Sequence, residues 1–369
     1  MHKFFPSPVQ LSLKQASIEF VGDSLVVDTG TFRRVWNWTG GGFVTTNLYF
    51  QQDAVTCMEP AFNADWRLPV CEDDNPPAQL QTVKASVSDD EGFTSEHIRV
   101  VAEISYPSVC LALRYEIWVY PGIAGVRTQL HIKTLPGFEW CGLLPKSETT
   151  ERSQKVARLS CGYQRQDYLP IDFEGTSRHL IGHYSDTQNR NDPFLSLLLE
   201  GSDDRELTHS YVCEWANACG VESAVAGVLL LKESHKCVNQ HGHDTGTFAC
   251  VPTTGLENHG WGILPHELDG EWRPSWGSWC LAYGSSDLGR QTAIKAFDQV
   301  RFPIREQDVY VQANTWGSSE GWLEHRDAAS EANVLKEIAA CADVGIDVLQ
   351  IDDGWQGDDY ESWQPIAPR

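Results

Sequence analysis

The segment Val344–Glu361 reads VGIDVLQIDDGWQGDDYE, and it decides how the C-terminal part of the chain is interpreted. Its largely apolar run leads directly into two adjacent carboxylates, Asp352 and Asp353, and then into a glycine and Trp355. A short apolar run that ends at polar and glycine residues is typical of a buried strand. The sequence therefore predicts a strand over 347–351 with two like charges at its carboxyl end.

The residues before this strand complete a predicted strand–helix–strand unit. The stretch VYVQANTW, at 309–316, is rich in residues that favour strands. Gly345 is placed to end a helix between the two strands. That helix has an apolar face of helical period, formed by Leu335, Ile338, Ala339 and Ala342. A helical crossover joins parallel strands, and α/β proteins carry their chemistry at the carboxyl ends of such strands.

Most of the chain before this unit predicts short strands without helices between them. VCLALRYEIWVY, at 109–120, and GVRTQLHIKT, at 125–134, alternate apolar and polar residues as half-buried strands do. Glycines at 40–42 lie between TFRRVWNW and FVTTNLYF and predict a tight hairpin. Further strands are expected near 96–105, 194–200, 209–215, 225–232 and 276–283. This pattern favours an antiparallel sandwich.

The charge balance excludes some classes of partner. The chain has 369 residues, with 28 Lys and Arg against 51 Asp and Glu, and its formal net charge is -23. Such a field repels phosphates and anionic lipid, so we expect neither nucleic acid nor a membrane as a partner. The longest aliphatic run, 224–231, is much shorter than the roughly 20 residues of a spanning helix. Eleven cysteines without a C-x-x-C pair, and an N-terminus without a secretory pattern, predict a cytoplasmic protein.

One segment contains the ligand types that zinc prefers, at His235, Cys237, His241 and His243. The spacing matches no standard zinc site, so a polar turn between strands is the better interpretation. The sequence also lacks a glycine-rich phosphate loop and an activated nucleophile pattern. We therefore predict no metal and no cofactor.

The adjacent carboxylates Asp352 and Asp353 admit three interpretations. One of them caps the loop that follows by accepting hydrogen bonds from backbone N–H groups. Alternatively, both bind a metal together with Asp358 and Asp359. In the third interpretation, both accept hydrogen bonds from neighbouring sugar hydroxyls while a tryptophan ring packs on the apolar face of the sugar.

The strand ends carry a resemblance to a known family. NTW at 314–316, and QIDDGWQ one helix later at 350–356, resemble the first two βα units of the barrel in family 36 glycoside hydrolases, the α-galactosidases and raffinose synthases. The resemblance implies a mainly β chain, with a large antiparallel β-sandwich (a supersandwich) over 1–285 and a connector over 286–308. The first βαβ unit of a (β/α)8 TIM barrel would follow over 309–369. A closed barrel takes about 250 residues, so this barrel is expected to be truncated.

The same resemblance implies a function and a set of site residues. Asp352 and Asp353 would accept hydrogen bonds from the 4- and 6-hydroxyls of galactose. Trp316 and Trp355 would line or support that subsite, and Trp66 of the sandwich would overhang it. The reaction would be the retaining hydrolysis of terminal α-galactosides of the melibiose and raffinose type. The nucleophile, in a Lys-x-Asp motif, and the acid/base belong to later strands, so no catalytic residue is assigned and this chain alone is expected to be inactive.

Two other functions stay open. The chain could act as a non-catalytic carbohydrate-binding or assembly β-sandwich module, or as a raffinose-synthase-like α-galactosyl transferase. In each case the expected partner is a galactose-containing oligosaccharide. Exposed faces of a partial barrel would also favour self-association, which is compatible with a homo-oligomer.

Overall fold

The structure is a computed structural model of the chain that describes residues 6–51, 53–55, 64–68, 74–139, 165–171, 177–181, 211–213, 218–233, 247–251, 255–259, 261, 263, 268–317 and 327–355. The chain divides into two compact units, Met1–Phe302 and Pro303–Arg369. The strand expected near 194–200 and the histidine-rich segment 235–243 lie outside the described residues. No helix within the described ranges is both long and apolar enough to cross a membrane.

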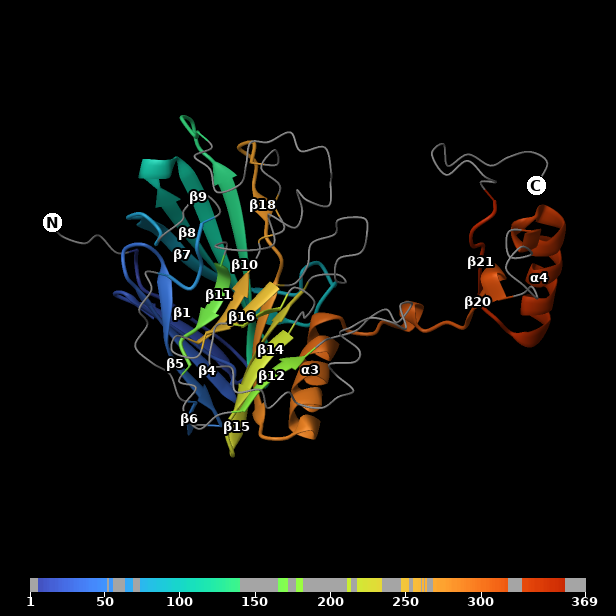
Figure 1. Ribbon diagram of the computed structural model, residues 1–369, viewed down its shortest axis with the longest axis horizontal. Helices are drawn as coiled ribbons and strands as arrows, with labels where there is room; N and C mark the ends of the chain where they lie inside the picture. The colour runs from blue at the N-terminus through green and yellow to red at the C-terminus, as the bar shows by residue number, and fades with distance from the viewer. Residues whose placement is uncertain are drawn as a thin grey trace. The chain divides into compact units, whose positions relative to one another are not determined.

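The first unit is built mainly of antiparallel strands (Figure 1). Among the described residues, one sheet has its strands in sequence order, each paired with the next. Its strands are β1 (Val9–Leu13), β2 (Ala16–Val21), β3 (Ser24–Asp28), β4 (Phe32–Trp38), β5 (Phe43–Phe50) and β6 (Asp53–Val55). The hairpin that was predicted around the glycines at 40–42 is confirmed as the β4–β5 pair.

A larger sheet has the order β12-β14-β15-β19-β10-β9-β8-β7 among the described residues, and β18 pairs with β10 beside this path. Its strands are β7 (Gln79–Ser88), β8 (His97–Tyr106), β9 (Leu111–Val119), β10 (Gly125–Thr134), β12 (Ser177–Ile181), β14 (Ala218–Glu222), β15 (Ala226–Lys232), β18 (Arg273–Pro274) and β19 (Ser278–Gly284). A third sheet, in the order β11-β17-β16-β13, consists of β11 (Arg165–Leu169), β13 (Tyr211–Cys213), β16 (Thr247–Val251) and β17 (Gly255–His259). A short 3-10 helix, η1 (Pro107–Val109), precedes β9.

The core of the first unit lies between the faces of these sheets. The alternation that predicted β9 is confirmed at its start, where Leu111 and Leu113 are fully buried and Arg114 is half-buried, whereas both faces of the strand are buried from Tyr115 to Val119. Aromatic rings join the two larger sheets, and the ring centroids of Trp36 on β4 and Tyr115 on β9 lie 6.3 Å apart at 80°. Edge-to-face packing of this kind adds to the burial of apolar area that holds a sandwich together.

The β4–β5 pair contains a β-bulge. Val35 faces Asn47 and Trp36 faces Thr45, so Thr46 is an extra residue on β5. The extra residue of a bulge changes which face of the sheet the side chains beyond it on that strand point to. It brings Thr45 into the buried interior of the unit, where the charged residues described below lie.

Helix α3 (Asp287–Arg301) belongs to the first unit and covers the second face of the large sheet (Figure 1). Ser286 caps it by accepting a hydrogen bond from the N–H of Gly289. Its buried residues Ile294 and Phe297 pack in a cluster with Trp279 of β19 and other aromatic residues. Helix α3 lies within the segment 286–308 that was expected to be a connector, and its amphipathic packing attaches it to the first unit.

A half-buried carboxylate holds the end of α3 on this sheet. Glu233, which follows β15, accepts hydrogen bonds from Arg127 Nε and Nη2 and from Arg301 Nε, each at 2.9 Å. Trp279 Nε1 donates a further hydrogen bond to it at 2.7 Å. Burial alone would raise the pKa of Glu233, but the two guanidinium groups outweigh it and lower the pKa to about 2.

The ion pairs of Glu233 make stability depend on pH in acid. The folded pKa is about 2 and the ordinary value is 4.5, so the stabilisation is complete above pH 4.5 and is lost as the pH falls toward 2. Near neutral pH, we expect Glu233→Gln to lower the free energy of unfolding by about 3 kcal/mol. Denaturant titrations over this pH range should show that the difference shrinks below pH 4.5. Glu271→Gln, in an exposed turn, is the control, and a Glu233→Gln difference that does not change with pH would contradict the assignment.

The second unit contains a parallel βαβ arrangement. Strands β20 (Gln312–Asn314) and β21 (Val348–Gln350) pair in parallel, and helix α4 (Glu331–Val344) lies between them in the sequence. Short 3-10 helices, η3 (Glu306–Asp308), η4 (Thr315–Gly317) and η5 (Asp327–Ala329), connect these elements. As predicted, Gly345 ends α4 in a left-handed conformation, with φ 77°. The strand–helix–strand prediction is confirmed, with shorter strands than the sequence suggested.

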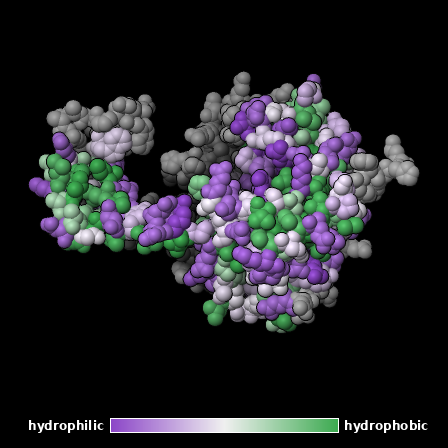
Figure 2. Space-filling model, turned by 180° about the vertical axis from the view of Figure 1, so that it is seen from behind, coloured by the Kyte–Doolittle hydropathy of each residue, from purple (hydrophilic) through white to green (hydrophobic). Residues whose placement is uncertain are grey.

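The predicted apolar face of α4 is exposed within this unit. Leu335 and Ile338 are 59% and 49% exposed, whereas Val334 and Cys341 are buried. Hydrophobic side chains accordingly gather on the surface of the unit (Figure 2). The helix contacts β21 and η5, so the residues described in this unit cover only one narrow side of it.

Candidate functional site

The two strand ends singled out in the sequence lie side by side. Gln312 of β20 pairs with Val348 of β21, and Asn314 pairs with Gln350. The residues after each strand therefore emerge at the same edge of the pair. Because both strands run in the same direction, this edge combines the carboxyl ends of β20 and β21.

Asn314 connects the two strand ends through its side-chain amide. Its Nδ2 donates a hydrogen bond to Asp352 Oδ2 at 2.8 Å, and its Oδ1 accepts one from the N–H of Trp316 at 2.8 Å. The N–H of Asp352 donates to the buried Thr315 Oγ1 at 3.0 Å. Asn314 and Thr315 therefore hold both ends in a fixed relation.

The two carboxylates of the pair differ in their surroundings. Asp352 Oδ1 also accepts a hydrogen bond from the N–H of Asp353 at 2.7 Å, so this carboxylate caps the turn that follows, as one of the three interpretations expects. Both side chains are half-buried, as are those of Trp316 and Trp355. Gly354 has a φ of 120°, which only glycine adopts without strain, and its turn leads the chain from Asp353 to Trp355.

Trp66 differs from the exposed sugar platform that the resemblance implies. Its side chain is 1% exposed, in the core of the first unit. Its Nε1 donates a hydrogen bond to Tyr106 Oη at 3.0 Å, and Tyr106 Oη donates to the backbone oxygen of Gly41 at 2.7 Å. A Cβ added at Gly42 would lie 2.9 Å from the Trp66 ring. Trp66 is thus a packing residue beneath the β4–β5 turn.

The potential metal ligands can be assessed only for the part of the chain that the structure describes. The described residues contain no group of three or more His, Cys, Asp or Glu side chains that could hold a metal ion. Asp358 and Asp359, which the metal interpretation requires, lie outside the described residues, as do the four zinc-type ligands. The described residues at this edge thus include two carboxylates, of which Asp352 is hydrogen-bonded to Asn314, and two half-buried tryptophans.

Comparison with known proteins gives a match in structure and not in sequence. No family model matches the sequence, and no curated protein sequence matches it either. A variant of the GH36 α-galactosidase AgaA from Geobacillus stearothermophilus, in complex with 1-deoxygalactonojirimycin, matches 90% of this chain and 50% of its own, with a TM-score of 0.51 and 10% identity. GH36 α-galactosidase AgaB from Geobacillus stearothermophilus matches 90% of this chain and 49% of its own, with a TM-score of 0.50 and 10% identity.

Over this span the fold is that of family 36 α-galactosidases. The expected β-sandwich of that family is confirmed at the level of fold. The chain spans about half the length of these GH36 enzymes. At 10% identity the similarity concerns the fold alone, and each side chain must be argued from its own contacts.

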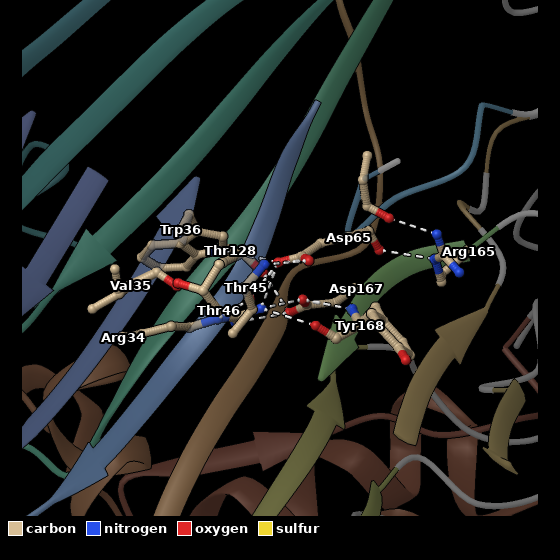
Figure 3. Close-up of polar contacts among 11 residues, drawn as sticks. Arg34, Val35, Trp36, Thr45, Thr46, Asp65, Thr128, Arg165, Asp167 and Tyr168 are labelled. Carbon is tan, nitrogen blue, oxygen red and sulfur yellow. Dashed lines mark hydrogen bonds and ion pairs between the residues drawn. The ribbon is translucent and has the colours of Figure 1, made fainter. Parts of the chain in front are cut away.

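The GH36-like sandwich also contains a buried charged cluster that sequence reasoning missed (Figure 3). Arg34 of β4 donates from Nη2 to Asp65 Oδ2 at 3.0 Å and to Asp167 Oδ1, on β11, at 2.8 Å. Its Nε donates to Thr45 Oγ1 at 2.9 Å. Thr128 Oγ1 of β10 donates to Asp167 Oδ2 at 3.0 Å. The cluster therefore connects all three sheets of the first unit.

The electrostatics of this cluster favour a structural role. Burial raises the pKa of the Asp65 carboxyl to about 6, although the Arg34 guanidinium opposes the rise. Asp65 also accepts hydrogen bonds from the N–H of Thr45 at 2.8 Å and from Trp36 Nε1 at 2.9 Å. The side chains of Arg34, Asp65 and Asp167 are at most 1% exposed. They face one another and not solvent, so no substrate reaches them in this arrangement.

Removing the guanidinium should strongly destabilise the first unit. Arg34→Met leaves Asp65 and Asp167 buried without their counter-charge, and we expect the free energy of unfolding to fall by about 3–5 kcal/mol. The neighbouring Arg33 offers a matched control, because its pair with Asp28 is on the surface. Arg33→Met should change stability by no more than about 1 kcal/mol. Equal effects of the two substitutions in denaturant unfolding would show that the cluster does not hold the sheets together.

The amide of Asn314 should control order at the strand ends. Asn314→Ala removes both of its hydrogen bonds, so we expect the Trp316 N–H to exchange with solvent about tenfold faster, measured by amide hydrogen exchange. The control is Asn333→Ala in the same unit, whose Nδ2 donates to the backbone oxygen of Ala328 at 2.9 Å. It should leave the exchange of Trp316 unchanged. Equal acceleration by both variants would mean that Asn314 has no specific positioning role.

Proposed function

We propose that this chain forms part of an α-galactosidase-like glycoside hydrolase, and that the ends of β20 and β21 form one side of its galactose subsite. The observation that carries the proposal is the hydrogen bond from Asn314 to Asp352, which fixes adjacent carboxylates at the carboxyl edge of two parallel strands. The shared fold with GH36 enzymes supports the same assignment. The substrates are terminal α-galactosides of the melibiose and raffinose type.

Each side chain has a binding role in this proposal. Each carboxylate oxygen of Asp352 accepts one hydrogen bond from within the protein. A carboxylate oxygen can accept more than one hydrogen bond, so both oxygens can also bind a sugar hydroxyl. Asp352 and Asp353 accept hydrogen bonds from neighbouring hydroxyls of the sugar, each contributing roughly 1.5–3 kcal/mol. Trp316 and Trp355 contact the apolar C–H face of the ring. Trp66 has no part in this subsite.

The bond-breaking groups of the proposed reaction lie elsewhere. Retaining hydrolysis needs two carboxyl groups about 5–5.5 Å apart on opposite sides of the scissile bond. Asp352 and Asp353 follow one another on a single strand end, so they orient the sugar and do not cleave it. Further strands and helices of a barrel would supply the nucleophile and the acid/base, and would cover the exposed residues Leu335, Ile338 and Val348.

We also propose a cytoplasmic location and the association of chains into a homo-oligomer. Among the described residues, Cys110, Cys280 and Cys341 are not in disulfide bonds, which suits a reducing cytoplasm. The exposed apolar residues of α4 would also support association of chains where no further barrel elements cover them. The substrate is a neutral oligosaccharide, in keeping with a protein of net charge -23 that repels anions.

A binding measurement tests the galactose subsite. We expect 1-deoxygalactonojirimycin, the ligand of the AgaA variant, to bind the complete chain, and Asp353→Ala to weaken this binding about tenfold by removing a charge-assisted hydrogen bond. Isothermal titration calorimetry at fixed ionic strength measures both affinities.

The matched control is Asp343→Ala, which removes an exposed carboxylate from α4 in the same unit. It should leave the affinity unchanged. Unaltered binding by Asp353→Ala, with a thermal unfolding profile like that of the native chain, would refute the subsite. The same variant should leave the unfolding of the first unit untouched.

A further inference from the structure

A pocket opens on the outer surface of the first sheet of the first unit. Its volume is about 530 Å³, and its lining includes Ser17, Asp28, Arg33 and Tyr49. Small-molecule sites typically have volumes of roughly 300–1,000 Å³. The pocket is therefore large enough for one or two hexose rings.

The strand register explains why these four side chains meet. Ser17 of β2 pairs with Asp28 of β3, Asp28 with Arg33 of β4, and Arg33 with Tyr49 of β5. Paired residues in neighbouring strands point to the same face of a sheet. The alternating neighbours, such as Arg34, are buried on the opposite face. A hydroxyl, a carboxylate, a guanidinium and a phenol thus form one row across four strands on the outer face.

The row is held in place before any ligand binds. Arg33 Nε donates to Asp28 Oδ2 at 2.9 Å, and the N–H of Gly30 donates to Asp28 Oδ1 at 2.8 Å. The guanidinium carbon of Arg33 lies 5.9 Å from the centre of the Tyr49 ring. At the pocket wall, Thr31 Oγ1 donates to the backbone oxygen of Gly122, in the turn between β9 and β10, at 3.3 Å. Both sheets therefore support the pocket.

The charges of the lining indicate the class of ligand. Asp28 and Arg33 neutralise each other, and the described residues of the lining include no further charged side chain. A bound anion would meet no unpaired cation among these described lining residues and would also face a protein of net charge -23. Donors and acceptors beside an aromatic ring instead match a neutral molecule that carries many hydroxyl groups.

We propose that the row Ser17–Asp28–Arg33–Tyr49 is a second saccharide-binding site, separate from the galactose subsite of the second unit. Asp28 accepts hydrogen bonds from sugar hydroxyls, and Arg33 donates one from Nη1, since its Nε and Nη2 are engaged by Asp28. Tyr49 contributes its ring to the C–H face of the sugar. The site holds an oligosaccharide on the surface of the protein and carries out no chemistry.

The test uses the 369-residue chain with Asp353→Ala, in which binding at the galactose subsite is weakened, and the effect of changes at Tyr49 then separates the two sites. Raffinose is titrated in a calorimeter, and we expect saturable binding that Tyr49→Ala weakens about tenfold. Tyr49→Phe keeps the ring and should bind within about threefold of the parent. Asn37→Ala is the matched control, an exposed residue of β4 outside the pocket lining, and should have no effect.

Three results would overturn the proposal: no saturable raffinose binding, binding that Tyr49→Ala leaves intact, or binding that inorganic phosphate displaces. Thermal unfolding shows whether Tyr49→Ala is folded. If Tyr49→Ala is not folded, Arg33→Met is used in its place, and we expect it to weaken raffinose binding. Arg33 is exposed, so this substitution should leave the fold intact. Failure here leaves the result with Asp353→Ala and 1-deoxygalactonojirimycin unaffected, so the two sites are judged separately.

Discussion

The pairing of Arg34 with Asp65 and Asp167 is the interaction on which the architecture of the first unit depends. Three charged side chains are removed from water where three sheets converge. A buried charge is tolerated only where partners replace its hydration. Sheets that slid or separated would leave a carboxylate or a guanidinium unpaired. The cluster therefore fixes how the sheets are placed, whereas apolar contacts alone would accept several arrangements.

The strands could be predicted because alternation is a local property of the sequence. Leu111, Leu113 and Ile117 mark β9 without reference to any other part of the chain. The charged cluster could not be predicted, because Arg34 and Asp167 are 133 residues apart. TFRRVWNW presents two arginines in a row, and residue type alone does not distinguish buried Arg34 from exposed Arg33. One available signal was the strict alternation of β4, which places Arg34 on the same face as Phe32 and Trp36.

At the strand ends, the sequence predicted where the adjacent carboxylates lie and missed the hydrogen bonds that hold them. The carboxylates and NTW were placed correctly at the ends of parallel strands. Asn314, which connects them, had no assigned role, because an asparagine at a strand end has many uses. Trp66 shows the opposite error, since a tryptophan in a polar stretch resembles a sugar platform until the packing of Tyr106 and Ala64 around it is known. For α4, the helical period of the apolar residues was predicted correctly, but the face predicted to be buried is exposed. The period shows that a helix has an apolar face, whereas the neighbouring elements decide which face is covered.

The bulge in β5 has a consequence for how this segment can change. Thr46 is the extra residue that β5 has relative to β4 at the bulge. The preceding residue, Thr45, donates hydrogen bonds to Asp65 from both its N–H and its hydroxyl. Loss of one residue here would realign the strand and turn Thr45 away from the carboxylate. Replacement of the outward-facing Asn47 would leave that alignment as it is. Natural variants of this strand should therefore differ in composition far more readily than in length.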